Sequence, residues 1–199
     1  MNKFLCASIS VSLALLATAA QAGRSCEERT VGAAVVAQAL ELAHEAQQKL
    51  DGAGAEVALI ARAGQNLSQY GVRYSHFGFV WRDHPKGAWR VMHELNECAT
   101  AASEIYDDGL GNFFLDDLWK MEELILIPNA STQQRLADLF RSRDHLALHE
   151  PHYNMVAYPF SVKYQNSNQW GLEIIAAAET RGAVISSRVQ AQQWLQFAP

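Results

Sequence analysis

Residues 74–95 constrain the fold of this chain most, because they have the pattern of two β-strands joined by a turn. The first half, Tyr-Ser-His-Phe-Gly-Phe-Val-Trp, alternates in the way that sends neighbouring side chains to opposite faces of a strand. Asp-His-Pro-Lys-Gly then favours a turn, and residues 89–95 are again β-prone. We predict an antiparallel hairpin with a loop of residues 82–87.

This hairpin places two histidines near each other. Its loop length predicts a register in which Trp81 lies opposite Ala88, Gly78 opposite Val91 and His76 opposite His93. Directly opposed residues have Cβ atoms about 5 Å apart, so the two imidazoles would share one face beside a glycine that leaves room. The alternative is that they are two polar residues on a sheet face and nothing more.

The first 22 residues have the pattern of a secretory signal peptide. Lys3 precedes an apolar run, and Ala20-Gln21-Ala22 is a small-residue cleavage site. We expect a mature protein of residues 23–199 that forms a single domain in the periplasm or outside the cell. Every apolar run is too short for a transmembrane segment.

The net charge bears on the protein's partners, and the cysteines bear on its cellular compartment. The formal net charge of −5 at pH 7 argues against nucleic acid as a partner. Cys26 and Cys98 remain after cleavage, and an oxidising compartment favours a disulfide between them. Two reduced thiols are the alternative.

The remaining periodicities predict an α+β fold with an antiparallel sheet packed against helices. We expect strands near residues 56–62, 74–82, 88–95 and 121–128, and helices near 31–50, 131–140, 168–178 and 188–196. Ser131 is the predicted cap of the second helix. Four acids between Asp107 and Asp117 are interpreted as solvated turns beside buried aromatic residues.

Three histidines, His145, His149 and His152, have a spacing that suggests a metal site. The sequence around them supplies no cysteine or clear carboxylate to complete a tetrahedral set. We therefore expect no metal site and no cofactor. The aperiodic, aromatic residues 151–165 are expected to pack over a groove.

The third predicted helix begins at a segment with features of a catalytic site. Asn166 and Gln169 form a capping pair, and Ser167 lies in the first turn, where free N–H groups and the positive end of the helix dipole favour a nucleophile or an oxyanion. The alternative is that Ser167 and Asn168 only cap the helix.

These motifs together resemble NlpC-type papain-like amidases, in particular their circularly permuted branch. Ser-His-Phe-Gly-Phe-Val and the histidine of the next strand are similar to that family's base and orienting residue. Tyr-Gln-Asn-Ser-Asn-Gln-Trp, residues 164–170, is similar to its Tyr-x-Asn-Cys-Ser-x-Phe/Trp nucleophile segment. The chain as a whole resembles a secreted bacterial family, domain of unknown function 2145, which brings no established activity.

The resemblance implies a papain-like fold with His76 as general base, His93 as the orienting residue and Ser167 in the nucleophile position. It also implies binding roles for the residues around them: Tyr74, Tyr164, Asn166, Asn168, Gln169 and Trp170. The departure is serine in place of cysteine, since an alcohol needs a base to take its proton during attack.

Three classes of function stay open at this point. The first is an amidase, peptidase or acyl hydrolase acting on the cell envelope. The second is a catalytically retired module that binds an envelope peptide, lipid or protein. The third is a structural or assembly factor of the envelope.

Overall fold

The fold is built on one antiparallel sheet. The structure, a computed structural model, describes residues 30–116 and 118–198. Five strands in the order β4-β3-β2-β1-β5 form the sheet: β1 (Val57–Ala63), β2 (His76–Trp81), β3 (Arg90–Asn96), β4 (Ser103–Gly109) and β5 (Lys120–Leu126). The expected α+β class with an antiparallel sheet and helices is confirmed.

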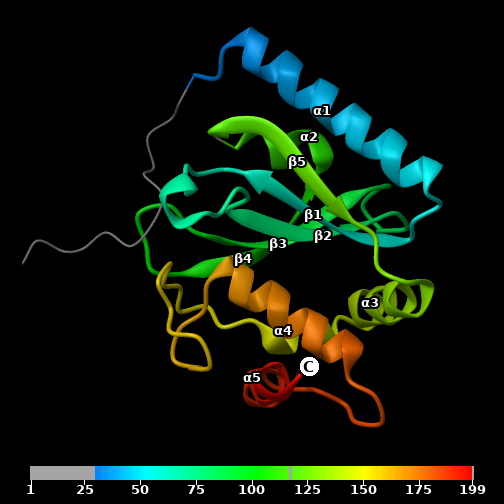
Figure 1. The fold of residues 1–199 in the computed structure, drawn as a ribbon, viewed down its shortest axis with the longest axis vertical. Helices are drawn as coiled ribbons and strands as arrows, with labels where there is room; N and C mark the ends of the chain where they lie inside the picture. Colours follow the sequence, from blue (N-terminus) through cyan, green and yellow to red (C-terminus); the bar gives the residue numbers. More distant parts are fainter. Residues whose placement is uncertain (1–29, 117, 199) are drawn as a thin grey trace, which may run out of the picture.

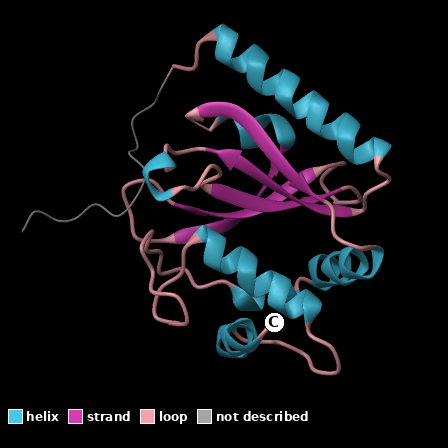
Figure 2. Cartoon of the chain, viewed as in Figure 1, coloured by secondary structure: helices cyan, strands magenta, loops and turns pink. Residues whose placement is uncertain are grey.

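Helices cover both faces of the sheet (Figures 1 and 2). One face carries α1 (Ala33–Gly52) and the short α2 (Leu110–Leu115). The other face carries α3 (Ala130–Ser142) and α4 (Ser167–Glu179), and α5 (Arg188–Phe197) packs against α4. Two short 3-10 helices, η1 (Ser68–Tyr70) and η2 (Asp144–Leu148), lie in the connections. No helix in the described ranges is long and apolar enough to cross a membrane.

The alternation in β2 divides its side chains between two hydrophobic cores. Phe79 and Trp81 point to the α3–α4–α5 side, where they pack with Trp170 and Phe140. Val80 points to the opposite side, into a core formed with α1 and α2. Burial on both sides is what holds β2 at the centre of the sheet.

Local capping signals explain where the helices on the second face begin. Asn166 accepts a hydrogen bond from the Gln169 N–H at 2.9 Å, which is the predicted cap of α4. The predicted cap of α3 is wrong. Asn129, two residues before Ser131, accepts the Thr132 N–H, and an amide oxygen in this position serves the same purpose as a hydroxyl.

The predicted hairpin register is wrong by two residues. Trp81 lies opposite Arg90 rather than Ala88, and Val80 rather than Gly78 lies opposite Val91. The loop is longer than expected because Trp89 adopts a left-handed φ of 55° and buries its ring, whose Nε1 donates to Asp51 of α1. A slip of two residues leaves every side chain on its predicted face.

The acidic segment after Cys98 contains an unpredicted strand. We interpreted its acids as solvated turns, but residues 103–109 form β4, which pairs with β3 along its whole length. This is an edge strand with mostly polar side chains, so its pairing partner stabilises it more than its own composition does. The predicted burial of aromatic side chains holds for Phe113 and Phe114 on α2, whereas Trp119 is half-exposed.

Two predictions depend on residues that the structure leaves undescribed. The predicted signal peptide, residues 1–22, lies outside the described residues, and so does Cys26. Export and the Cys26–Cys98 disulfide therefore stay predictions.

Candidate functional site: a serine and two histidines where strands diverge

The site lies where two neighbouring strands separate. β2 pairs with β1 from His76 to Trp81, but its ladder with β3 runs from Trp81 to Phe79 and ends there. β3 continues beside β4 as far as Asn96. The two strands therefore diverge beyond Gly78, and the start of β2 and the end of β3 form the two sides of a cleft.

Gly78 sits at the point of divergence. A Cβ added there would lie 2.7 Å from the Met92 carbonyl oxygen and 2.9 Å from the His93 Cβ. A contact that short with backbone cannot be relieved by a side-chain rotation, so any larger residue would push β2 and β3 apart. Glycine at this position therefore allows His76 and His93 to approach each other.

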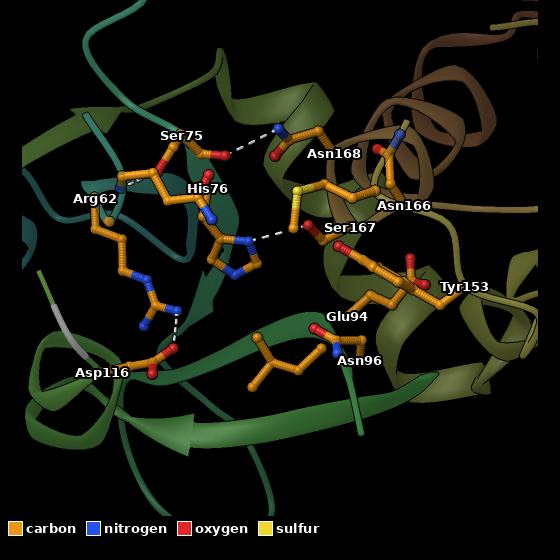
Figure 3. A pocket seen from close by; sticks show the side chains of 14 residues that line it. Arg62, Ser75, His76, Glu94, Asn96, Asp116, Tyr153, Asn166, Ser167 and Asn168 are labelled. Carbon is orange, nitrogen blue, oxygen red and sulfur yellow. Dashed lines mark hydrogen bonds and ion pairs between the residues drawn. The ribbon is translucent and has the colours of Figure 1, made fainter. Parts of the chain in front are cut away.

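Ser167 enters the cleft from the other face of the sheet. It is the first residue of α4, and the neighbouring Asn168 ties the helix to the sheet by donating from Nδ2 to the Ser75 carbonyl at 3.2 Å. The first turn of a helix leaves its N–H groups without intrahelical partners. The Ser167 hydroxyl thus lies next to backbone donors and to the start of β2 (Figure 3).

A continuous hydrogen-bonded chain runs from this serine to a carboxylate. The Ser167 Oγ is 3.1 Å from the His76 Nδ1, and the His76 Nε2 is 2.9 Å from the His93 Nδ1. The chain ends at Asp108 of β4, whose Oδ2 is 3.1 Å from the His93 Nε2. The two-residue difference between the predicted and the observed register does not separate the histidines, because His76 and His93 still lie on the same face of the sheet.

The carboxylate fixes the direction of every bond in this chain. An ionised Asp108 can only accept, so the His93 Nε2 carries a proton and its Nδ1 is an acceptor. The His76 Nε2 must then donate to the His93 Nδ1, which leaves the His76 Nδ1 as an acceptor for the Ser167 hydroxyl. These protonation states are assigned from the hydrogen-bonding pattern. Each imidazole needs only one proton for all of these hydrogen bonds to form, so both rings can be neutral.

The electrostatic environment keeps both imidazoles neutral. Desolvation lowers the pKa of His76 well below 6.5, with the positive charge of Arg62 as the next cause. Burial also lowers the pKa of His93, against the opposing effect of Asp108. The hydrogen bond from His93 lowers the pKa of Asp108, which is therefore ionised at neutral pH.

The cleft opens into a polar cavity of about 370 Å³. Ser167 and His76 lie on one side, and a buried Arg62 lies on the other, paired with Asp116 (Figure 3). Tyr153 stands beside the serine. Burial raises the pKa of Tyr153, and the neighbouring Ser167 hydroxyl partly offsets this effect.

The other predicted binding residues occupy different places. Asn166 and Asn168 line the polar cavity, and Tyr74 lines a second, apolar cavity on the far side of His76. Trp170 is fully buried against Phe79, so it supports the core and not the cavity wall. Two more residues lie near the loop before α4: Gln169, whose Nε2 donates to the Ser161 carbonyl, and Tyr164, beneath Lys163.

The three histidines with metal-like spacing have separate partners. The His145 ring contacts the Leu139 carbonyl, His149 contacts the Ser103 hydroxyl, and His152 pairs with Glu150. Within residues 30–116 and 118–198, no three His, Cys, Asp or Glu side chains are grouped so that they could hold a metal ion.

Five residues of the site were missed by the sequence interpretation. Asp108 and Asp116 were interpreted as parts of solvated turns, and Arg62, Glu94 and Tyr153 were not singled out. A signal for Asp108 was present, because Ser-Glu-Ile-Tyr-Asp-Asp at residues 103–108 alternates in part like an edge strand. Its pairing partner, however, lies in another segment of the chain.

Comparison with known proteins identifies the family. A sequence profile for uncharacterised proteins conserved in bacteria, DUF2145, matches residues 49–199, which is most of the chain. The chain belongs to the DUF2145 family. No curated protein and no solved structure matches it. The matched region of this DUF2145 protein contains the complete hydrogen-bonded chain from Ser167 to Asp108.

Glu94 of the DUF2145 protein is a buried acid whose pKa is shifted by its surroundings. It lines the polar cavity from β3, and neither carboxylate oxygen forms a hydrogen bond within the described part of the chain. The Ser103 hydroxyl is near enough to lower its pKa, but that hydroxyl contacts the His149 Nε2 at 3.0 Å. Burial dominates and raises the pKa of Glu94 from 4.5 to about 7.

This shift predicts a pH-dependent stability. Between pH 4.5 and 7 the unfolded chain loses the Glu94 proton while the folded protein keeps it, so the folded state loses stability as the pH rises. We expect Glu94→Gln to become more stable relative to wild type by about 2–3 kcal/mol between pH 5 and pH 8. Urea unfolding at the two pH values measures this difference.

The control for this experiment is Glu104→Gln, which removes an exposed carboxylate from the neighbouring strand β4. Its stability relative to wild type should change little between the two pH values. A Glu94→Gln difference that stays constant with pH would contradict a protonated Glu94 in the folded protein.

Proposed function

We propose that this protein is an exported hydrolase that cleaves an acyl bond through a papain-like site of the circularly permuted NlpC type. Ser167 is the nucleophile, His76 the general base, and His93 and Asp108 orient the base. The single observation that carries the proposal is the directed chain from the Ser167 hydroxyl through two neutral imidazoles to a carboxylate. The proposed substrate is a peptide or a lipid of the cell envelope.

The chemistry follows from the direction of that chain. The Ser167 Oγ attacks the substrate carbonyl carbon while its proton moves to the His76 Nδ1. The carbonyl oxygen becomes an oxyanion, which the Ser167 and Asn168 N–H groups of the first turn of α4 stabilise, since the Gln169 N–H already donates to Asn166. The tetrahedral intermediate then expels the alcohol or amine, which takes the proton from the His76 Nδ1. Water hydrolyses the acyl-enzyme by the same steps in reverse order.

The order of these groups along the chain is base first and nucleophile last. Nucleophile, base and orienting residue recur on unrelated folds in different chain orders, because only their geometry matters. Here an imidazole stands between the base and the carboxylate. The negative charge of Asp108 is thus one ring further from His76 than in a serine-histidine-aspartate triad, which makes His76 a weaker base.

A second candidate is a binding module in which catalysis has been lost. The serine in a position where the resembling amidases carry cysteine favours it, as does the low pKa of the base. A neutral imidazole of low basicity removes a proton from an alcohol less readily than it forms a pair with a thiol. In this case the polar cavity would hold an envelope ligand without cleaving it.

A fluorophosphonate probe separates the two candidates, because it phosphorylates a serine only where a base activates the hydroxyl. We expect wild-type protein to gain one probe adduct on Ser167, located by mass spectrometry of its peptides, and Ser167→Ala to gain none. Ser131→Ala is the matched control, since Ser131 also lies in the first turn of a helix but bonds to Asn129 instead of a histidine.

Labelling of wild type and Ser131→Ala but not of Ser167→Ala would support the hydrolase. Folded wild-type protein that stays unlabelled after prolonged exposure would overturn it in favour of the binding module.

A further inference from the structure

A second cavity of about 390 Å³ lies between α4 and the sheet, next to the catalytic pair. It is formed by the α4-facing side chains of β1, β2 and β5 and by one face of α4. Its lining residues are Leu59, Ala61, Tyr74, His76, Phe77, Leu124, Leu126, Asn168, Leu172 and Ile175. We call it the apolar groove.

The walls of the apolar groove are mostly hydrocarbon, and their polar side chains are Tyr74, His76 and Asn168. No Asp, Glu, Lys or Arg is among its lining residues in the described chain. The one hydroxyl, that of Tyr74, already donates to the Glu123 carbonyl at 3.1 Å. A ligand in the groove would therefore find almost no polar partners, and the groove is within the size range of small-molecule sites.

The rim of the groove leaves apolar side chains in water. Leu124 and Leu126 of β5 are 47% and 53% exposed, and Leu172 of α4 is 46% exposed. Leucines that surround a concave apolar surface differ from single exposed leucines, because a ligand that enters the groove covers all of them at once. This arrangement favours an apolar occupant.

The groove adjoins the candidate active site. His76 and Asn168 line both cavities, whereas Ser167 faces the polar one. A carbonyl held at the Ser167 Oγ thus lies near both cavities, one apolar and one that contains Arg62 and Asp116. The two shared residues place the groove next to the reacting serine and histidine.

We propose that the apolar groove binds the acyl chain of the substrate and that the polar cavity binds its head group. This inference rests on the proposed function and names its substrate class: an ester or amide of a fatty acid. Attack by Ser167 forms a fatty acyl-enzyme and releases the neutral alcohol or amine, which takes the serine proton by way of His76, and water then releases the fatty acid. A peptide would require partners for its backbone N–H and carbonyl groups along its length, and the groove offers few polar side chains, His76 and Asn168 beside the hydrogen-bonded Tyr74.

The test compares probes that differ only in chain length. Burial of each methylene favours binding by about fourfold. We therefore expect a decyl fluorophosphonate to label Ser167 at least 100-fold faster than the ethyl compound. Leu172→Glu should remove most of this preference, measured as the ratio of the decyl to the ethyl labelling rate within the variant.

The matched control is Leu40→Glu, which introduces the same charge at a 53%-exposed leucine on α1, on the opposite side of the sheet. It should keep the wild-type preference. Equal labelling by the short and long probes would contradict the proposed acyl-chain site but would not contradict the proposed hydrolase function. Faster reaction with peptide p-nitroanilides carrying one apolar side chain than with the p-nitroanilide of decanoic acid would also overturn the acyl-chain site, in favour of a peptide.

A binding measurement keeps the groove testable if the protein does not react with any probe. Ser167→Ala protein should bind cis-parinaric acid, with displacement by decanoate, and the additional change Leu172→Glu should weaken binding at least tenfold. This result with an unreactive wild-type protein would support the groove and reject the hydrolase. Absence of binding by the folded Ser167→Ala protein would reject the groove.

Discussion

Ser167→Cys is expected to produce a thiol that iodoacetamide alkylates at pH 6 roughly 100-fold faster than an ordinary cysteine. Two features of the site lower the pKa of a thiol at this position. The first turn of α4 presents backbone N–H groups and the positive end of the helix dipole, and the His76 Nδ1 lies 3.1 Å from the Ser167 Oγ. A thiolate beside His76 would also offset the desolvation that keeps this imidazole neutral in the wild-type protein.

Two further variants separate the helix from the histidine. Ser131→Cys places a thiol in the first turn of α3 without a neighbouring imidazole, and it should react at the rate that the helix end alone produces. Adding His76→Ala to Ser167→Cys should lower its reactivity to that of Ser131→Cys. Wild-type protein measures the background from the native cysteines.

A thiol at residue 167 that titrates near pH 8.5 and does not respond to His76→Ala would contradict the proposed nucleophile position. Ser167 would then be a helix-terminal residue only. A highly reactive thiol together with an unlabelled wild-type serine would instead support the binding module.

Asp108→Asn is expected to lower the rate at which a fluorophosphonate labels Ser167 by roughly 10²- to 10⁴-fold. The side-chain amide introduced by this substitution can donate to the His93 Nε2, whereas the carboxylate of Asp108 only accepts. His93 would then carry its proton on Nδ1 and donate to the His76 Nε2. The His76 proton would move to Nδ1, the atom that must accept from the serine.

This reversal has a spectroscopic signature that simple destabilisation lacks. Nitrogen-15 NMR of the imidazoles should show both histidines with a proton on Nε2 in the wild type and on Nδ1 in Asp108→Asn. Asp107→Asn is the control, because Asp107 is adjacent and similarly exposed but pairs with Lys86 and His84. It should change neither the spectra nor the labelling rate. Equal effects of the two substitutions would mean that the chain beyond His76 has no part in the chemistry.

Local patterns were sufficient to predict much of the site. The two-residue alternation placed His76 and His93 on one face, and a register error of two residues could not change that. Asn166, with Gln169 three residues later, marked the first turn of α4 and hence the position of Ser167. These features depend on a few consecutive residues, so the sequence alone determined them.

Contacts between distant segments decided the rest. Trp89 turns toward α1 and lengthens the hairpin loop, which no pattern within residues 82–89 indicates. β4 is a strand because β3 pairs with it, and only that pairing brings Asp108 to the His93 ring. The buried Glu94 carboxylate and the apolar groove also arise from packing between elements far apart in the chain. The sequence by itself determined the candidate nucleophile and the candidate base. The tertiary structure decided which carboxylate bonds to the histidines and which cavities surround them, because burial and partner geometry are properties of the assembled sheet and helices.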